Sequence, residues 1–134
     1  MKERLDDEII SMLKKDSRTA NWRIAQKLKI SEGTVRYRIN RMLGSGKIRR
    51  FTIEEGTNRI GALVLVKTFK SSAKTAKQIS TSLEVAHIYE LSGNEDIALI
   101  ISANSIDEIN SIVDEMRAMN GVKETETKII LKSW

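Results

Sequence analysis

The chain contains no cysteine and no proline, a single histidine and few aromatic residues. Without cysteine it can form no disulfide, no thiolate metal site and no cysteine nucleophile. Its longest apolar runs, such as residues 97–101, are far shorter than the roughly 20 residues that a membrane-spanning helix requires. The chain also begins with a charged stretch, residues 2–8, rather than with the basic and apolar regions of a secretory signal. We therefore expect a cytoplasmic protein without disulfides and without membrane association.

The residues required for catalysis are also scarce. The single histidine, His87, falls within an alternating stretch, where an interface or core position is expected rather than a catalytic base. No glycine-rich phosphate loop is present, and no group of His, Asp and Glu has metal-ligand spacing. We expect a protein that is not an enzyme and that uses no metal and no cofactor.

Positive charge is concentrated in the first half of the chain. Residues 1–60 carry 15 Lys and Arg against 8 Asp and Glu, a balance of +7, whereas residues 61–134 carry 8 against 10, a balance of −2. Binding to nucleic acid requires concentrated positive charge, because affinity comes from displacing counterions from phosphates. The division predicts two modules with different partners, the first of them nucleic acid.

Three apolar stripes follow one another in the first module. Leu5, Ile9 and Leu13 recur every four residues, which predicts an amphipathic helix over residues 4–15. A second helix is expected from about residue 20 to 28, and a third after Ser31, whose hydroxyl can cap it. Because only three or four residues join the last two helices, they must cross steeply, which is typical of a helix-turn-helix motif.

The outward face of the third helix carries side chains that can hydrogen-bond to base edges or phosphates. A basic outer face also occurs in three-helix bundles that bind no DNA. The next segment, residues 47–53, alternates apolar and basic residues after a Gly-Ser-Gly turn, which predicts the half-buried strand of a winged helix-turn-helix. Its basic side chains would lie on the DNA backbone. The candidate DNA-binding residues are Ser31, Glu32, Thr34, Arg36, Tyr37, Asn40 and Arg41 in the motif and Lys47, Arg49 and Arg50 in the strand.

The second module reads as alternating strands and helices after a polar linker. Strands are expected over residues 61–69, 85–91, 97–102 and 122–131, with helices over 73–83 and after Ser105, where Glu108 completes a capping box. The order βαββαβ is that of a ferredoxin-like fold. We predict an α+β protein with a winged helix-turn-helix domain at 1–53, a linker at 54–60 and a βαββαβ domain at 61–134.

Two helices in this pattern cover only one face of the sheet. The predicted uncovered face carries Val64, Val66, Ile129 and Leu131, and a bare apolar sheet in so small a domain predicts self-association. The alternative is a sheet covered by its own linker.

Several spaced motifs carry a resemblance to a known family. They are Leu5-Asp6-Asp7-Glu8-Ile9-Ile10, Ile24-Ala25-x-x-Leu28-x-Ile30-Ser31, Val35-x-x-Arg38-Ile39-x-Arg41-Met42 and Gly46-x-Ile48. Together they resemble the Lrp/AsnC family of transcription regulators, and the resemblance, which suggests an archaeal source, extends over essentially the whole chain. One departure is Lys29, which occupies a turn position usually held by glycine and would cost ~1 kcal/mol in a left-handed conformation.

The resemblance implies that the second module is a ligand-sensing (RAM) domain that forms dimers and binds an amino acid. The family's Gly-x-x-Asp sensor loop is matched by Gly93 and Asp96, with Asn94 between them. Glycine would admit a carboxylate to the backbone amides, and the aspartate would pair with an ammonium group. From the residues alone, this loop is a hairpin turn. Glu95 stands where the family often has an aromatic residue.

A second wall of the effector site would come from a neighbouring dimer. Its candidates are Ser111 and Glu115 on the last helix and Thr125 and Thr127 on the last strand. Hydroxyls and a carboxylate suit a basic side chain, which favours lysine or arginine over a neutral amino acid. The alternative is a solvated helix face and ordinary strand residues.

The predicted function is a sequence-specific DNA-binding regulator of amino-acid metabolism. A dimer, or a tetramer or octamer built from dimers, would present paired recognition helices about 34 Å apart to a near-palindromic operator. An amino-acid effector would alter that assembly. The alternative is an effector-independent architectural or autoregulatory DNA-binding protein on the same fold.

Overall fold

The computed structural model describes residues 2–56 and 58–134. The chain divides into two compact units, one ending at Glu55 and the other spanning Gly56–Trp134. No helix in the described ranges combines the length and apolar character that crossing a membrane requires.

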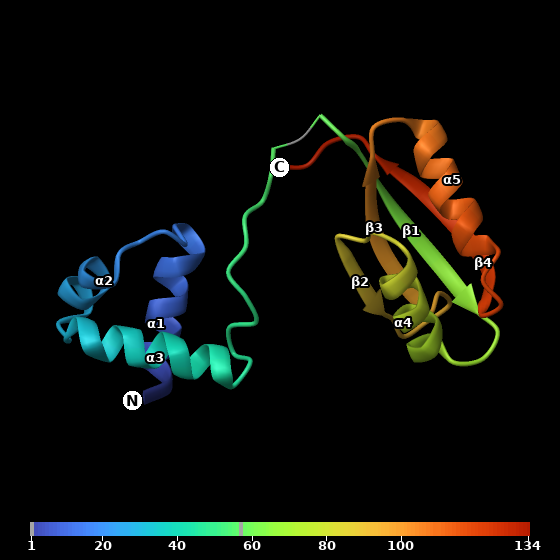
Figure 1. Ribbon diagram of the computed structural model, residues 1–134. Helices are drawn as coiled ribbons and strands as arrows, with labels where there is room; N and C mark the ends of the chain where they lie inside the picture. The colour runs from blue at the N-terminus through green and yellow to red at the C-terminus, as the bar shows by residue number, and fades with distance from the viewer. Residues whose placement is uncertain (1, 57) are drawn as a thin grey trace. The chain divides into compact units, whose positions relative to one another are not determined.

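The first unit contains the helices α1 (Lys2–Lys15), α2 (Asn21–Leu28) and α3 (Glu32–Gly44) (Figure 1). Each helix contributes one apolar stripe to a shared core, as the four-residue spacing predicts. The buried apolar side chains are Ile9, Leu13, Ile24, Ala25, Val35 and Met42.

The turn between α2 and α3 confirms the predicted cap, and Lys29 has the left-handed conformation for which the sequence analysis expects strain. Lys29 adopts φ 56° and ψ 43°, a left-handed conformation, and the amide of Ile30 donates to the carbonyl of Ala25 at 3.0 Å. The Ser31 hydroxyl accepts from the amide of Thr34 at 3.0 Å. These bonds satisfy backbone groups at the end of α2 and the start of α3. They therefore allow a short turn to join the two helices.

The predicted strand over residues 47–53 is wrong. These residues form no strand; the amide of Ile48 donates to the carbonyl of Met42 at 3.0 Å, and Ile53 is 87% exposed. A strand requires a neighbour for its hydrogen bonds, and the first unit has no other strand among its described residues. The alternating pattern therefore had no ladder to join.

The second unit has the predicted βαββαβ order. Its elements are β1 (Ile60–Thr68), α4 (Ser72–Ser82), β2 (His87–Glu90), β3 (Ile97–Ala103), α5 (Ile106–Arg117) and β4 (Val122–Ile130). The strands form one antiparallel sheet in the order β2-β3-β1-β4. Both helices lie on one face of this sheet (Figure 1). Ser105 caps α5, and the Glu108 carboxylate accepts from the amide of Asn104 at 2.7 Å rather than from that of Ser105.

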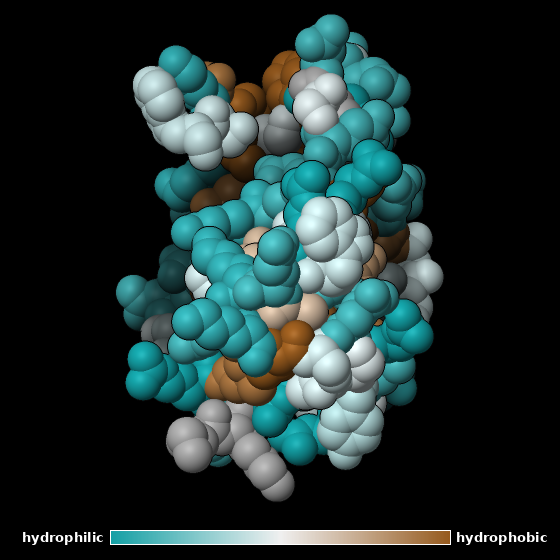
Figure 2. All heavy atoms as spheres, turned by 90° about the vertical axis from the view of Figure 1, so that its left-hand side faces the viewer, coloured by the Kyte–Doolittle hydropathy of each residue, from teal (hydrophilic) through white to brown (hydrophobic). Residues whose placement is uncertain are grey.

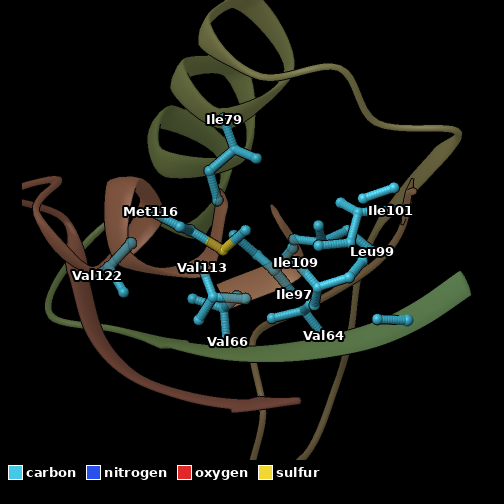
Figure 3. Close-up of a cluster of buried hydrophobic side chains, with 12 residues drawn as sticks. Val64, Val66, Ile79, Ile97, Leu99, Ile101, Ile109, Val113, Met116 and Val122 are labelled. Atoms are coloured by element: carbon cyan, nitrogen blue, oxygen red, sulfur yellow. The ribbon is translucent and has the colours of Figure 1, made fainter. Parts of the chain in front are cut away.

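The assignment of sheet faces in the sequence prediction is wrong. Val64 and Val66 are fully buried and point toward α4 and α5 in the core, not away from it (Figure 3). Ile129 pairs with Ala62 and so shares the covered face, and Leu131 lies beyond the end of β4. β1 is apolar on both faces, so its alternation could not show which face the helices cover.

The uncovered face carries the other set of strand residues. Register places Leu63 and Leu65 of β1, Ile100 of β3, and the stacked rings of His87 and Tyr89 of β2 on this face. The open face therefore carries an apolar patch on β1 and β3, formed by other residues than those predicted, while β4 contributes the charged side chains of Lys128, Glu126 and Glu124 to it.

Candidate DNA-binding surface and effector site

The recognition helix α3 exposes the side chains that the sequence prediction assigned to DNA. Arg36, Tyr37, Asn40 and Arg41 are exposed, and Tyr37 is 65% exposed. The cap residues differ, because the Thr34 hydroxyl lies 2.7 Å from the Ser31 hydroxyl and is partly covered. Ser31 and Thr34 therefore orient the start of α3, while the side chains one to two turns later reach outward.

One flank of α3 borders the start of α2. Arg36 and Asn40 line a hollow of about 270 Å³ together with Thr19 and Asn21 at the start of α2. Arg36 also pairs with Glu32 at 3.0 Å. Both side chains of that pair are exposed, and such pairs within a helix contribute little, so a phosphate or base can displace Glu32.

The segment after α3 is basic although it forms no strand. Arg49, Arg50, Lys47 and Lys14 line a hollow of about 290 Å³ whose apolar wall includes Phe51. In the described part of the chain, neither Arg49 nor Arg50 has a carboxylate partner. The Lys47 ammonium lies 2.8 Å from the Asp7 carboxylate, and this hydrogen bond raises the pKa of Lys47.

The visible face of the molecule in Figure 2 is mostly hydrophilic, with apolar side chains only in small patches.

The other flank of α3 is tied to α1 by the carboxylate of Asp6, which the sequence analysis named only as part of a family motif. Asp6 is 3% exposed, and its two oxygens accept from Arg38 at 2.7 Å and from Arg41 at 3.3 Å. A signal was present, because Asp6 precedes Ile9 by three residues and Leu13 by seven, and therefore lies on the apolar stripe of α1. A carboxylate on a buried stripe requires a cationic partner.

In the predicted sensor loop, Gly93 adopts φ 123°, while Asn94 is exposed. Asp96 already has partners within the chain, since its Oδ2 atom accepts from the amide of Thr68 at 2.7 Å and from its hydroxyl at 3.1 Å. The Asp96 carboxylate thus caps the end of β1. Glu95, the neighbouring residue, lines a shallow hollow of about 110 Å³.

That hollow contains Thr125 but not the other predicted effector residues. Its lining residues are Leu65, Lys67, Glu95, Glu124, Thr125 and Glu126. Lys67 lies 3.6 Å from Glu124, and Lys128 lies 2.8 Å from Glu126. Three carboxylates and two lysines therefore lie at the junction of β1, β4 and the sensor loop.

The remaining candidates lie on or under α5. The Thr125 hydroxyl accepts from Arg117 Nε at 2.8 Å, and the hydroxyl of Thr127 is buried without a hydrogen-bond partner among the described residues. Ser111 donates to the carbonyl of Asp107 at 3.0 Å. At 100° per residue, Ser111 and Glu115 project from a different side of α5 than Arg117 does. A single chain therefore does not bring these four residues into one pocket.

Comparison with known proteins matches both units. Residues 2–49 match the family model of winged helix-turn-helix DNA-binding domains, and residues 61–134 match that of the Lrp/AsnC ligand binding domain. The transcriptional regulator LysM of Saccharolobus solfataricus is 39% identical over 96% of this chain and 93% of its own length. LysM of Sulfurisphaera tokodaii is 38% identical over 96% of this chain and 94% of its own length.

Solved structures have the same fold. Escherichia coli AsnC superposes with a TM-score of 0.77 at 25% identity, over 97% of this chain and 92% of that one. Bacillus subtilis LrpC superposes with a TM-score of 0.79 at 23% identity, over 97% and 94% of the two chains. With a helix-turn-helix unit and a βαββαβ ligand-binding domain, this chain belongs to the Lrp/AsnC family of DNA-binding transcription regulators.

Proposed function

We propose that the protein binds near-palindromic operators as a dimer or larger assembly and regulates amino-acid metabolism. The exposed face of α3 is the observation that carries the DNA half of this proposal. Arg36, Tyr37 and Asn40 contact base edges, and Lys47, Arg49 and Arg50 contact phosphates. The guanidinium groups of Arg49 and Arg50, which have no carboxylate partner among the described residues, and the hollow beside them support the phosphate role.

Dimer formation is proposed to bury the open face of the sheet. Leu63, Leu65 and Ile100 lie there without a covering helix, and exposed apolar faces of this kind are typical of interfaces between subunits. Two copies related by a two-fold axis would carry two recognition helices, which suits an operator with two half-sites.

The proposed effector is a basic amino acid, lysine or arginine. The hollow beside the sensor loop has three carboxylates, from Glu95, Glu124 and Glu126, against Lys67 in its lining and Lys128 paired with Glu126, and this net negative charge favours a cationic side chain. The buried hydroxyl of Thr127, one of the predicted effector residues, has no hydrogen-bond partner in the described part of the chain and is a further polar group that a ligand could bind. The likeness to the LysM regulators also supports lysine.

Thermal unfolding in the presence of each of the twenty amino acids tests the effector. Lysine or arginine should raise the unfolding temperature, because a ligand that binds only the folded state stabilises it. A rise with leucine or glutamine alone, or no rise with any amino acid, would contradict the basic effector.

The second candidate function is effector-independent DNA binding, which the bonds of Asp96 favour. Both hydrogen bonds from Thr68 reach the same Asp96 oxygen, so this carboxylate has a structural role without a ligand. DNA footprints with and without lysine separate the two functions, because an effector must change DNA binding or assembly. Identical footprints under both conditions would favour the effector-independent function.

A further inference from the structure

Asp6 connects α1 to the recognition helix from inside the first unit. Its side chain is 5% exposed. Oδ1 accepts from Arg38 Nη1 at 2.7 Å, and Oδ2 accepts from Arg41 Nη2 at 3.3 Å. Arg38 and Arg41 are three residues apart and therefore project from one side of α3. One buried anion thus holds two cations of the recognition helix, and the group keeps one net positive charge.

The two arginines differ in exposure. The side chain of Arg38 is 13% exposed, whereas that of Arg41 is 48% exposed. Within the described ranges, Arg41 has no protein acceptor for its Nε and Nη1 groups. Arg41 also lies one helical turn from the exposed Tyr37. A guanidinium group has five donors in a planar fork, so Arg41 can bind Asp6 with one nitrogen and an outside anion with the others.

We propose that Asp6 is a positioning residue for DNA binding, which holds the guanidinium of Arg41 at the edge of the exposed face of α3 so that its remaining N–H groups bind a DNA phosphate. An arginine that is already held in place loses less side-chain freedom on binding than a free one. Fork-shaped contacts with phosphate are among the stronger hydrogen bonds of proteins. This role rests on DNA binding by the helix-turn-helix unit and requires no effector.

The charge state of Asp6 fits this role. Burial acts to raise its pKa, but the hydrogen bond from Arg38 and the positive charges of Arg38, Arg41 and Lys47 together hold the pKa below its ordinary value. The carboxylate is therefore ionised at neutral pH and retains both arginines.

The test is a titration of a mixed-sequence DNA duplex, followed by fluorescence anisotropy at several salt concentrations, with the full chain and four variants. Arg41→Ala should weaken binding about tenfold, because it removes hydrogen bonds to a charged group, and should reduce the salt slope by about one unit. Asp6→Asn should weaken binding to a similar extent although it adds one positive charge to the protein. Glu8→Gln makes the same charge change at a half-exposed position of α1, where the carboxylate pairs with Arg4 and not with α3, and should not weaken binding. The double variant Asp6→Asn with Arg41→Ala should bind no more weakly than Arg41→Ala.

Two outcomes would overturn the proposal. The first is that Asp6→Asn and Glu8→Gln change the affinity for DNA equally. The second is that Asp6→Asn lowers the affinity for DNA as much in the Arg41→Ala background as in the unaltered chain. A carboxylate with a structural role alone would lower the unfolding temperature and leave the affinity and salt slope of the folded protein unchanged. Binding by the unaltered chain in the same titration tests the proposed function separately.

If the Asp6→Asn variant does not fold, the Arg41→Lys variant tests the proposal in its place. Lysine keeps the positive charge but has a single nitrogen in place of the fork, so it cannot bridge Asp6 and a phosphate in the same way. We expect Arg41→Lys to bind DNA nearly as weakly as Arg41→Ala. Binding equal to that of the unaltered chain would refute the proposal.

Discussion

At the scale of single residues, the turn of the DNA-binding motif contains one strained position. Lys29 is the only described residue other than glycine with a positive φ. A left-handed conformation brings its Cβ close to backbone atoms, which glycine avoids. The chain tolerates this strain because the turn bonds and the buried residues on both helices fix the conformation.

Lys29→Gly should therefore raise the free energy of unfolding by about 0.5–1 kcal/mol. Urea denaturation measures this change, with an unchanged slope showing that the surface exposed on unfolding is the same. Lys27→Gly, in the last turn of the adjacent helix α2, serves as the control and should lower stability by about 1 kcal/mol. Equal losses for both variants would contradict strain at Lys29.

Asn40 and Arg49 are expected to act differently on DNA. Asn40→Ala should reduce the preference for operator over random DNA by about 1–3 kcal/mol, because an amide pairs with a base edge. Arg49→Ala should weaken binding to all sequences alike and reduce the salt slope by about one unit. Competition titrations with both kinds of DNA measure these effects. If each variant weakened operator and random DNA equally, the division between base and phosphate contacts would be wrong.

At the scale of elements, the pairing of α1 with α3 depends on a buried charge. Removing one partner of a buried ion pair leaves the other charge uncompensated, so Asp6→Asn should lower the free energy of unfolding by about 3 kcal/mol at neutral pH. The folded-state pKa of Asp6 is lowered, so its contribution is complete above the unfolded pKa of about 3.9. It is lost as the pH falls through the folded pKa.

Denaturation of the unaltered chain and of Asp6→Asn at a series of pH values checks this dependence. The difference in stability between the two should be constant above about pH 4 and should shrink at lower pH. A difference that grew on acidification would have the opposite sign and would contradict a lowered pKa.

The contact between α4 and the turn before β4 requires a glycine. A Cβ at Gly121 would collide with the hydroxyl of Thr75, which is 4% exposed. Gly121→Ala should lower stability by about 1–3 kcal/mol. Gly44→Ala, where a Cβ meets nothing within 4 Å, should not lower it. Thermal unfolding compares the two, and Thr75→Ala combined with Gly121→Ala should lose less than the sum of the single changes, because the smaller side chain leaves room for the added methyl group.

At the scale of the whole molecule, the open face of the sheet determines assembly. Leu63 lies on this face, between Ile100 of β3 and Lys128 of β4. Leu63→Glu would place a charge in the proposed interface, where its desolvation is unfavourable. We expect the variant to sediment as a monomer and to bind operator DNA more weakly, because the two recognition helices are no longer linked.

Gln78→Glu provides the matched control for this variant. Gln78 is exposed on α4, which lies on the other face of the sheet, so the same charge change should leave assembly unaltered. Sedimentation velocity of both variants measures the outcome. A Leu63→Glu protein that remained a dimer would place the interface elsewhere.

Local patterns in the sequence were sufficient to predict the helices, the βαββαβ order and the exposed residues of α3. Helix caps and apolar spacing involve residues that are close in the chain, so they can be recognised from the sequence alone. Examples are the caps at Ser31 and Ser105 and the four-residue spacing of Leu5, Ile9 and Leu13. The identity of the DNA-facing side chains follows from the same helical period.

Only the tertiary structure decided the remaining features, because they depend on contacts between distant residues. The Asp6–Arg41 bond joins residues 35 positions apart. The covered face of β1 depends on where α4 and α5 pack, since Val64 and Leu65 are equally apolar. Residues 47–53 have the alternation of a strand, but the described residues of their unit form no strand beside them. A period shows which residues share a side of an element, whereas the packing of other elements decides which side is buried.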